Sequence, residues 1–265
     1  LLDSAPDPYR TAVSLIDEIV PVSGWSDIDT FMIAAKALAT KYQVVGVYTG
    51  VDPCGVAAAT LRQKLGLRTP TAEAMKVILN KFLLRQRLRE CGLSKLQNYL
   101  GQDADKWSEW KFGKARAYFK PVHGFFSAYV QKCASVADLG AAKAEWIKGV
   151  ANETPFVRDY LLTVNEYHLE EAIEGELLSV EGMSSGGKFT SLGLLSRILY
   201  SRNPIVEMGS CFPYPHPLAD QIVKLVASAH QALGFTDGPT HTEVIVSPSG
   251  EIEIIDLNPR FVGAD

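Results

Sequence analysis

The stretch EIEIIDLNPRF, residues 251–261, decides the fold of this protein. Its isoleucines and leucine have the apolar character of a β-strand, and the polar residues Asp256, Asn258 and Arg260 follow at a spacing of two. Side chains two apart in a strand point to the same face. The spacing therefore predicts that an acid, an amide and a guanidinium meet at one strand end.

A second strand-like run, HTEVIV at residues 241–246, precedes this stretch, and the Ser-Pro-Ser-Gly sequence at residues 247–250 is typical of a hairpin turn. In an evenly paired hairpin, Glu243 lies opposite Ile254 and diagonal to Asp256, on the same face. We therefore expect both carboxylates at the same end of one β-hairpin.

Glu243, Asp256 and Asn258 are the candidate metal ligands. Two carboxylates and an amide oxygen suit a hard cation such as Mg²⁺, which keeps several waters and completes its shell with substrate phosphates. Arg260, directly after them, offers a bidentate clamp for an anion. The alternative is that the acidic pair lies at the solvated rim of the hairpin and binds nothing.

The composition excludes several classes of protein. Apolar residues make up 47% and charged residues 21% of the 265 residues, as in ordinary globular domains. The net charge of −4 argues against nucleic-acid binding, which requires a basic surface. No apolar run approaches the roughly 20 residues of a membrane span. We therefore expect neither a nucleic-acid nor a membrane partner.

The four cysteines, Cys54, Cys91, Cys133 and Cys211, show no CxxC spacing, so neither a zinc site nor a disulfide framework is predicted. We expect them to be reduced and buried, as in a cytoplasmic protein. The first residues, LLDSAPDPYR, contain no initiator Met and lack the basic-then-apolar pattern that is typical of a signal peptide. We expect both ends of the sequence to be trimmed and the last lobe to be incomplete.

The amino-terminal quarter alternates strand-like and helical segments. DEIVPV (17–22) and QVVGVYTG (43–50) predict strands, whereas residues 28–42 and 55–67 predict helices. This order favours a parallel sheet with helices on its faces. TGVDPCG, at residues 49–55, would then lie at the carboxyl end of a strand, where such sheets bind ligands.

One long helix is predicted over residues 71–92, with Thr71 as its cap and Gly92 at its end. The arginines Arg85, Arg87 and Arg89 are expected on its solvated face. Its core-facing stripe is expected to comprise Met75, Val77, Ile78, Phe82, Leu83 and Leu88.

Short strands are expected over residues 111–183. The turn SSGGK (184–188) joins the last of them to another strand in a hairpin. Residues 218–234, LADQIVKLVASAHQALG, predict an amphipathic helix.

Five motifs in this order resemble those of the ATP-grasp superfamily, and more closely its carboxylate–amine ligases of the L-amino-acid-ligase type. The motifs are NKFLLRQRLRECG (80–92), FKPVHGFFSAYV (119–130), EEAIEGELLSVEGM (170–183), PIVEMGSCFP (204–213) and the hairpin ending in EIEIIDLNPR (251–260). The resemblance implies an ATP-grasp fold of the α/β class with α+β lobes. Its expected parts are a Rossmann-like pre-ATP-grasp domain (1–74), linker helices with a small nucleotide-gripping lobe (75–182) and a C-terminal catalytic lobe (183–265).

The same resemblance assigns the contacts to the ATP phosphates. Lys81 matches the lysine on the helix before the gripping lobe, and Lys120 matches the lysine near adenine and the α-phosphate. Both are compact cations that can neutralise phosphate charge, although two surface lysines are the alternative. Gly124 and Ser127 match a glycine-rich phosphate loop, in which Phe126 and Tyr129 replace later glycines.

At the hinge between the lobes, the resemblance implies that Glu170 and the backbone at Ala172 and Ile173 hold adenine. The family's ribose-binding glutamate falls on Leu177, and the adjacent Glu176 is the candidate substitute. A shift of one residue in a strand reverses the face of the side chain.

Glu207 matches an active-site glutamate near the substrate amine, and Ser210 stands where relatives often have a histidine. Glu243, Asp256 and Asn258 match the metal ligands, with Asp256 replacing a more common glutamate. Arg260 matches the arginine that holds the acyl phosphate or tetrahedral intermediate.

The resemblance implies an enzyme that uses ATP and Mg²⁺, or Mn²⁺, to join a carboxylate to an amine through an acyl phosphate. Its partners would be small-molecule acid and amine substrates, and relatives are often homodimers. Two alternatives stay open at this point. One is an ATP-grasp reaction without an amine acceptor, such as carboxylation or phosphoryl transfer. The other is a nucleotide-binding module with weak catalysis.

Overall fold

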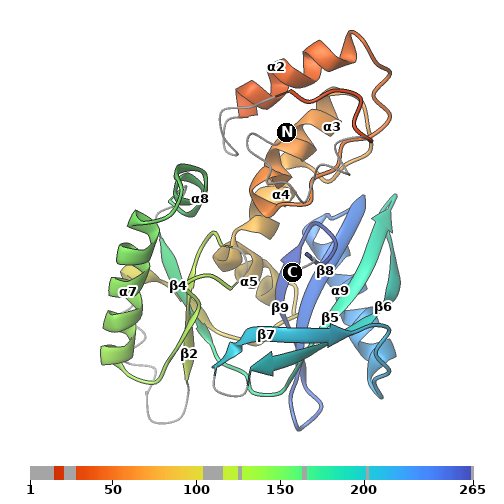
Figure 1. The fold of residues 1–265 in the computed structure, drawn as a ribbon. Helices are drawn as coiled ribbons and strands as arrows, with labels where there is room; N and C mark the ends of the chain where they lie inside the picture. The colour runs from red at the N-terminus through yellow and green to blue at the C-terminus, as the bar shows by residue number, and fades with distance from the viewer. Residues whose placement is uncertain are drawn as a thin grey trace.

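The computed structural model describes residues 15–20, 28–103, 116–124, 127–162, 166–200 and 203–263. In these residues the chain forms a four-stranded and a five-stranded antiparallel sheet, with helices between and around them. Figure 1 shows the smaller sheet beside α7, the larger sheet in front of α9, and α4 and α5 between the two sheets. This mixed helix-and-sheet architecture confirms the predicted fold class.

The amino-terminal part contains helices but no sheet in its described residues. The helices α2 (Ile28–Ala39) and α3 (Gly55–Lys64) confirm two predictions, and the short 3₁₀ helix η2 (Asp52–Cys54) leads into α3. The two predicted strands are not paired: residues 17–20 and 43–50 form no ladder, and residues 21 and 22 lie outside the described chain. The predicted parallel sheet is therefore absent from residues 15–20 and 28–70.

The predicted long helix is two helices, α4 (Ala72–Leu79) and α5 (Lys81–Glu90). They meet at Asn80, which has an extended backbone and accepts a hydrogen bond from the backbone N–H of Leu83 at 3.0 Å. An asparagine side chain competes for backbone donors in this way, so it starts a new helix instead of continuing the old one. Lys81 consequently begins α5.

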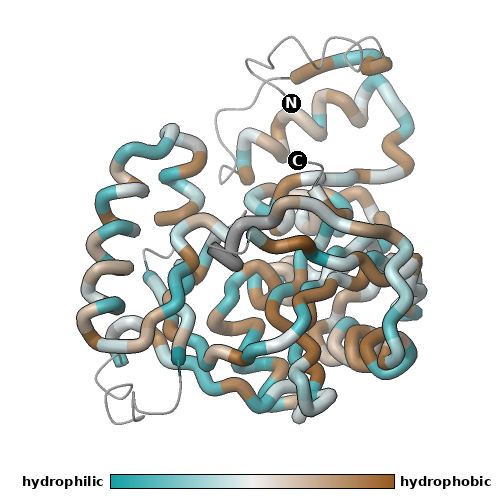
Figure 2. The backbone as a smooth tube through the Cα atoms, turned by 60° about the horizontal axis from the view of Figure 1, so that its bottom comes forward, coloured by the Kyte–Doolittle hydropathy of each residue, from teal (hydrophilic) through white to brown (hydrophobic). Residues whose placement is uncertain are grey.

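The smaller sheet has the strand order β1-β4-β2-β3. One face packs on α7 through a core that contains Phe119, Leu169 and Trp146. In Figure 2, hydrophobic and hydrophilic positions alternate along α7, as a helix with one buried face requires. The elements are β1 (Asn98–Leu100), η3 (Gly101–Asp103), β2 (Ala117–Pro121), β3 (Gln131–Cys133), α7 (Val136–Ala151), α8 (Pro155–Leu161) and β4 (Tyr167–Glu171).

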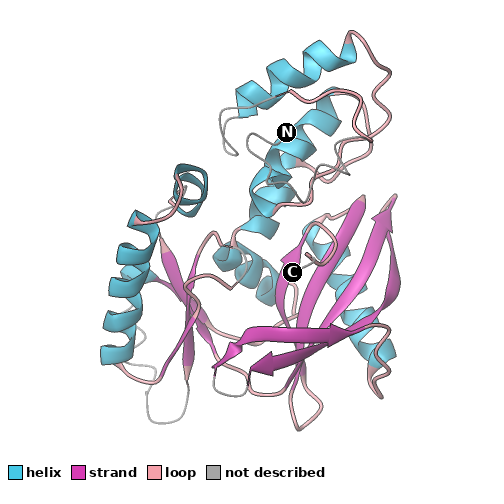
Figure 3. Cartoon of the chain, viewed as in Figure 1, coloured by secondary structure: helices cyan, strands magenta, loops and turns pink. Residues whose placement is uncertain are grey.

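The larger sheet has the strand order β7-β6-β5-β8-β9, and its broad, twisted surface is visible in Figure 3. The turn at Gly186 and Gly187 has φ values of 58° and 79°, which glycine adopts readily, and confirms the predicted hairpin. The chain leaves the smaller sheet at Glu171 and enters the larger sheet at Glu176. The boundary that was expected between the nucleotide-gripping lobe and the C-terminal lobe, after residue 182, therefore lies inside β5. The elements are β5 (Glu176–Ser185), β6 (Lys188–Tyr200), β7 (Asn203–Cys211), α9 (Ala219–Leu233), β8 (Gly238–Val246) and β9 (Ile252–Asn258).

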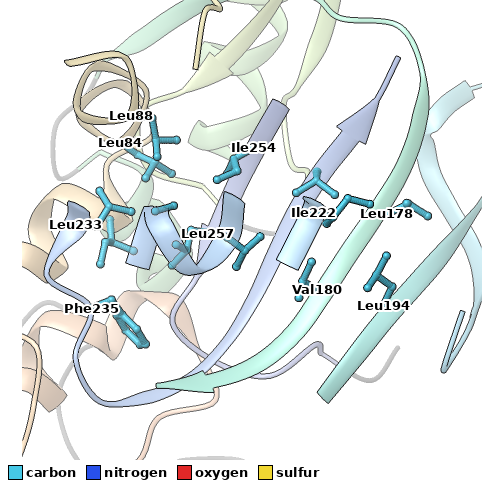
Figure 4. Packing of buried hydrophobic residues seen from close by; sticks show 14 of the residues in the cluster. Leu84, Leu88, Leu178, Val180, Leu194, Ile222, Leu233, Phe235, Ile254 and Leu257 are labelled. Atoms are coloured by element: carbon cyan, nitrogen blue, oxygen red, sulfur yellow. The ribbon is translucent and has the colours of Figure 1, made fainter. Parts of the chain in front are cut away.

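Helix α9 confirms the predicted amphipathic helix and ends at Gly234, which has the left-handed φ of 68°. It covers one face of the larger sheet. Figure 4 shows Ile222 beside Leu178 and Val180 of β5, with Leu84 and Leu88 of α5 near Ile254 of β9. This core leaves the opposite face of the sheet for polar side chains.

The β8–β9 hairpin has a different register from the even pairing expected. Val244 lies opposite Ile254, but Glu243 lies opposite Asp256, so Ile255 is an extra residue on β9. Because the bulge inserts one extra residue, the side chains beyond it point to the opposite face of the sheet from that of a regular strand. It lets both Ile254 and Leu257 reach the core while Asp256 shares a face with Glu243.

The cysteines form no disulfide, but only Cys54 and Cys133 are buried, whereas Cys91 and Cys211 are exposed. The expectation that all four are buried is therefore wrong.

Across the described stretches, none of the helices has both the length and the apolar character needed to cross a membrane.

We expect Ile222→Ala to lower the free energy of unfolding by about 2–5 kcal/mol, because it opens a cavity under the larger sheet. Ile222 is fully buried, whereas Leu192, at 55% exposure, provides a matched control. Leu192→Ala should change the stability by less than about 0.5 kcal/mol. Denaturant unfolding measures both, and equal losses would contradict the assignment of this core.

His230 makes the fold sensitive to acid. Its ring lies 2.9 Å from Ser184 Oγ and 3.2 Å from Thr240 Oγ1, and burial lowers its pKa from 6.5 to about 4. The folded state therefore stays neutral while the unfolded state takes up a proton below pH 6.5. The stabilisation is present above that pH and is lost as the pH falls towards 4.

We expect this histidine to contribute up to about 3 kcal/mol of the loss in stability between pH 6.5 and 4. His230→Gln, which retains hydrogen-bonding groups but does not titrate in this range, should flatten that part of the curve. The measurement is denaturant unfolding at a series of pH values. A variant with the same acid slope as the wild type would show that His230 is not the source.

Candidate active site

The polar face of the larger sheet brings the three candidate metal ligands together. Glu243 lies opposite Asp256 across β8 and β9, and Asn258 lies opposite His241. The Asn258 amide donates to the backbone carbonyl of His241 at 3.4 Å. The bulge at Ile255 therefore places two carboxylates at directly paired positions, closer than the diagonal arrangement expected.

Lys81 reaches this face from the start of α5. Its Nζ pairs with Asp256 Oδ2, and its backbone N–H donates to the carbonyl of Val122 at 3.0 Å. Burial opposes the charge of Lys81, but the carboxylates of Asp256, Glu243 and Asp52 together raise its pKa above its ordinary value. The lysine is therefore held as a cation next to the candidate metal ligands.

A small cavity lies between these parts of the chain. Its lining includes the predicted residues Lys81, Gly124, Asp256 and Asn258. The other lining residues are Asp52, Ile78, Leu79, Tyr160 and Leu257. A wider hollow along α5, lined by Gln86, Arg89 and others, contains none of the candidate residues. We therefore place the site at the smaller cavity, where the polar groups converge.

Lys120 and Glu170 lie on the face of the smaller sheet that is turned towards α5. Lys120 Nζ donates to Glu170 Oε1 at 2.5 Å, and Arg85 Nε donates to Glu170 Oε2 at 2.8 Å. Burial alone would raise the pKa of Glu170, but the charges of Arg85 and Lys120 outweigh it and hold this pKa well below its usual range. Both carboxylate oxygens are thus engaged, and Glu170 holds Lys120 in place.

Arg85 is buried, at 1% exposure, so its predicted position on a solvated face is wrong. Besides Glu170, it donates to Ser94 Oγ at 2.8 Å and lies 3.6 Å from Glu253 of β9. Leu83, predicted in the core, is instead 38% exposed. Splitting the predicted helix at Asn80 gives α5 its own orientation, which turns Arg85 inward.

A second buried network lies beside Glu243. His241 Nδ1 pairs with Glu181, and Arg197 lies 2.8 Å from both His241 Nε2 and Glu243 Oε1. Burial lowers the pKa of His241, but its bonds to Glu181 and Glu243 outweigh this and raise it to about 9. Burial likewise opposes ionisation of Glu243, yet the positive charges of His241 and Arg197 lower its pKa to about 2. Glu243 is therefore a carboxylate at neutral pH.

Arg260 is held by Asp52 of the amino-terminal part. Its Nε lies 3.0 and 3.1 Å from the two oxygens of Asp52, and one terminal nitrogen lies 2.9 Å from Oδ2. Burial raises the pKa of Asp52, whereas the charge of Arg260 acts in the opposite direction. Arg260 therefore forms an ion pair with a buried carboxylate of the protein, and its role as a clamp for a substrate anion stays a prediction.

The predicted phosphate loop is described except for Phe125 and Phe126. Ser127 and Tyr129 have φ values of 51° and 60°, a conformation that favours glycine. The hydroxyl of Tyr129 donates to Glu153 at 2.6 Å, and its ring packs so closely on Gly149 that a Cβ there would clash. Long-range contacts thus hold the left-handed conformation at one of the positions where a glycine was expected.

Two predicted glutamates are not brought into this cluster. Glu176 shares a face with the core residue Leu178 and accepts a hydrogen bond from Tyr214 at 2.9 Å, on the side covered by α9. Its predicted ribose contact is therefore not supported, because one position along a strand reverses the face. Glu207 lies in β7, but its side chain is outside the described part.

Ala172 and Ile173 are the hinge residues whose backbone was predicted to hold adenine. Ala172 donates its backbone N–H to the Arg116 carbonyl at 2.8 Å, and Ile173 is half-buried.

Sequence reasoning missed three charged residues of the site, Asp52, Arg85 and Arg197. Asp52 lies in the TGVDPCG stretch that was expected to border a ligand site, which is the one signal the sequence offered. The two arginines stand in a helix and a strand where nothing in the local pattern marks them as buried.

The donor set fits Mg²⁺ in its chemistry. Carboxylate and amide oxygens at one strand end are the ligands that this ion prefers. In the stretches described, no three His, Cys, Asp or Glu side chains form a ready-made metal cluster, and the set of Glu243, Asp256 and the amide of Asn258 stays a prediction. Asp256 and Glu243 are already paired with Lys81 and Arg197, and an ion would share them with these cations.

A model of the ATP-grasp domain matches residues 116–265, more than half of the chain. The chain belongs to the ATP-grasp family. The match begins one residue before β2 of the smaller sheet and includes the β8–β9 hairpin with its paired acids. Among curated protein sequences, none matches this chain.

Solved structures share the fold at low sequence identity. The L-amino acid ligase from Bacillus licheniformis has a TM-score of 0.68 and 21% identity, over 92% of this chain and 56% of the ligase. The N5-carboxyaminoimidazole synthetase of Staphylococcus aureus, complexed with ADP, has a TM-score of 0.71 and 12% identity, over 94% and 61%.

A third structure is the biotin carboxylase domain dimer of 2-oxoglutarate carboxylase from Hydrogenobacter thermophilus, in complex with MgADP, ADP and bicarbonate. It has a TM-score of 0.69 and 18% identity, over 94% of this chain and 56% of that one. The present chain thus spans less than two thirds of each of these ATP-grasp structures.

We expect Arg85→Leu to lower the free energy of unfolding by about 3–5 kcal/mol, because it leaves the buried Glu253 without its cation and Glu170 with Lys120 alone. Arg87→Leu is the matched control, since Arg87 is exposed, pairs on the surface with Glu90 at 3.3 Å and donates to the Ala232 carbonyl at 3.4 Å. Its loss should stay within about 1 kcal/mol. Denaturant unfolding at neutral pH compares the two. Similar losses at both positions would argue against a structural role for the buried arginine.

Proposed function

We propose that this chain carries the catalytic part of an ATP-dependent ligase that joins a carboxylate to an amine. ATP and a divalent ion, Mg²⁺ or Mn²⁺, would bind between the two sheets. The carboxylate would first become an acyl phosphate, and the amine would then replace the phosphate to give an amide, with ADP and phosphate released.

One observation carries this proposal. Two cations, Lys81 and Arg260, lie at the same strand end as the oxygen ligands Glu243, Asp256 and Asn258. Phosphoryl transfer needs little covalent chemistry from the protein, because it depends on positioning and on neutralising phosphate charge. A strand end with candidate metal ligands and two ion-paired cations supplies both.

In the first step, Lys81 and Lys120 would hold the nucleotide phosphates while the substrate carboxylate attacks the γ-phosphorus. Glu243, Asp256 and Asn258 would hold Mg²⁺, which when bound neutralises phosphate oxygens. The bond between the γ-phosphorus and the ADP oxygen breaks as the new P–O bond forms. Lys120 is buried and the Lys81 side chain is 17% exposed, and each is paired with a carboxylate, so both lysines keep their orientation and their charge.

In the second step, the amine would attack the acyl carbon and expel phosphate. Arg260 would hold the oxyanion, since a guanidinium presents paired donors to two oxygens. Glu207 would orient the ammonium or accept its proton. Glu170, Ala172 and Ile173 would border the adenine, and Gly124 and Ser127 the phosphates.

The runner-up is an ATP-grasp reaction without an amine acceptor. The biotin carboxylase domain structure shares this fold with a TM-score of 0.69, close to the 0.68 of the amino acid ligase. A weakly catalytic nucleotide-binding module is the third candidate, but the ion-paired lysines and arginine have no need to converge in a decayed site.

The four free cysteines fit a reducing, cytoplasmic setting, and dimerisation is part of the proposal by analogy with relatives.

We expect ADP release from Mg²⁺ and ATP to require two components from a panel of amino acids and small carboxylic acids tested singly and in pairs. Chelation of the metal should abolish it. Arg260→Ala should lower kcat by about 100-fold or more, since one oxyanion donor is worth about 10²–10³ in rate. The measurement is coupled ADP release by the whole protein, with the amide product identified by mass spectrometry.

Arg68→Ala is the control variant, because this exposed arginine pairs with Asp237 away from the cavity. Its rate should equal that of the wild type. ADP release stimulated by an acid alone, with no amine requirement, would replace the ligase by the carboxylation or phosphoryl-transfer alternative.

A further inference from the structure

The stretch TGVDPCG carries a buried acid that the proposed mechanism does not use. Asp52 is 4% exposed and lines the same cavity as Lys81 and Asn258. It lies 208 residues from Arg260 in the sequence, yet the two side chains form a bidentate ion pair. The amino-terminal part thus reaches directly into the candidate site.

The geometry of this pair leaves part of the guanidinium available. Asp52 receives bonds from Nε and one terminal nitrogen of Arg260, and the other terminal nitrogen donates to the Phe261 carbonyl at 3.1 Å. Each terminal nitrogen carries two N–H groups. As far as the chain is described, these contacts leave one N–H on each terminal nitrogen. These two N–H groups, the free edge of the guanidinium, can donate to two oxygens of an anion.

Asp52 is mounted rigidly. Its neighbour Cys54 belongs to a buried cluster with Ala57 and Phe31, which fixes η2 and α3. The loop before it is closed by Thr49, whose hydroxyl donates to the Val51 carbonyl at 2.9 Å and accepts from its N–H at 3.2 Å. Because the backbone is fixed on both sides of Asp52, its carboxylate can fix the orientation of the Arg260 guanidinium.

We propose that Asp52 is the positioning residue for Arg260, and that the pair stays intact while the free edge of the guanidinium binds the reacting acyl group. This inference rests on the proposed function for its catalytic part. Asp52 does not touch substrate. It fixes the plane of Arg260, and a displacement of about 1 Å in such a group can cost about 100-fold in rate.

The test compares Asp52→Asn with Asp237→Asn. Asp237 also joins an arginine of the amino-terminal part, Arg68, to the larger lobe, but it lies outside the cavity. With the acid and amine found for the wild type, Asp52→Asn should lower kcat by about 100-fold. Its KM for ATP should stay within about threefold of the wild type, because the lost interaction belongs to the transition state. Asp237→Asn should match the wild type in both.

Asp52→Glu keeps the charge but moves it by one methylene, and it should recover part of the lost kcat. Partial recovery separates positioning from a general loss of folding, which would lower the amount of active protein without changing KM or the pH profile. Should Asp52→Asn fail to fold, Asp52→Glu alone decides. A kcat for either variant within about threefold of the wild type would overturn the proposal.

A second readout does not depend on turnover. In ¹⁵N-labelled protein, the Nε–H signal of Arg260 is identified by its loss in Arg260→Lys, and a buried bidentate pair should slow its exchange with water. Asp52→Asn should shift this signal and speed its exchange, and Asp237→Asn should leave it unchanged. An unchanged signal in Asp52→Asn would overturn the pairing. If the Arg260 signal responds to Asp52→Asn as expected but the wild type shows no turnover with any acid and amine, the ion pair stands and the proposed ligase function is contradicted.

Discussion

The burial of Arg85 is the constraint on which the site depends. This guanidinium contacts Glu170 of the smaller sheet, Glu253 of the larger sheet and Ser94 between them. A buried charge without partners costs several kcal/mol, so the elements that carry these carboxylates have to stay around α5. The helix that begins with Lys81 is therefore fixed relative to both sheets at once.

The positions of several charged residues of the site depend on the burial of Arg85. Glu170, held on one oxygen by Arg85, uses the other to hold Lys120. Arg85 also lies 3.5 Å from the carbonyl of Ile255, the bulged residue of β9. The bulge in turn sets Asp256 opposite Glu243. One buried cation thus connects the lysine of the smaller lobe with the acids of the larger lobe.

Four cations of the described site are each paired with a carboxylate. The pairs are Lys81 with Asp256, Lys120 with Glu170, Arg197 with Glu243, and Arg260 with Asp52. Such pairing is required because unpaired charges are expensive in a buried place. Under the proposed function, a nucleotide and its metal would share the groups of the Lys81–Asp256 and Arg197–Glu243 pairs, whereas the Arg260–Asp52 pair would stay intact.

The sequence by itself determined the local elements and the chemistry of the hairpin. The periodicity of α9, the Gly-Gly turn at residues 186–187 and the spacing of Asp256 and Asn258 are local patterns, so they could be predicted without knowledge of the fold. The motif order was enough to indicate the ATP-grasp family, because each motif keeps its place along the chain.

Only the tertiary structure decided the partners of the charges and the register of the strands. The bulge at Ile255, the inward turn of Arg85 and the pairing of Asp52 with Arg260 depend on contacts between residues far apart in the sequence. The same holds for Glu176, which a one-residue offset places on the opposite face of β5. Local pattern fixes which residue types are present at a strand end, whereas burial against distant elements determines which charges have to meet.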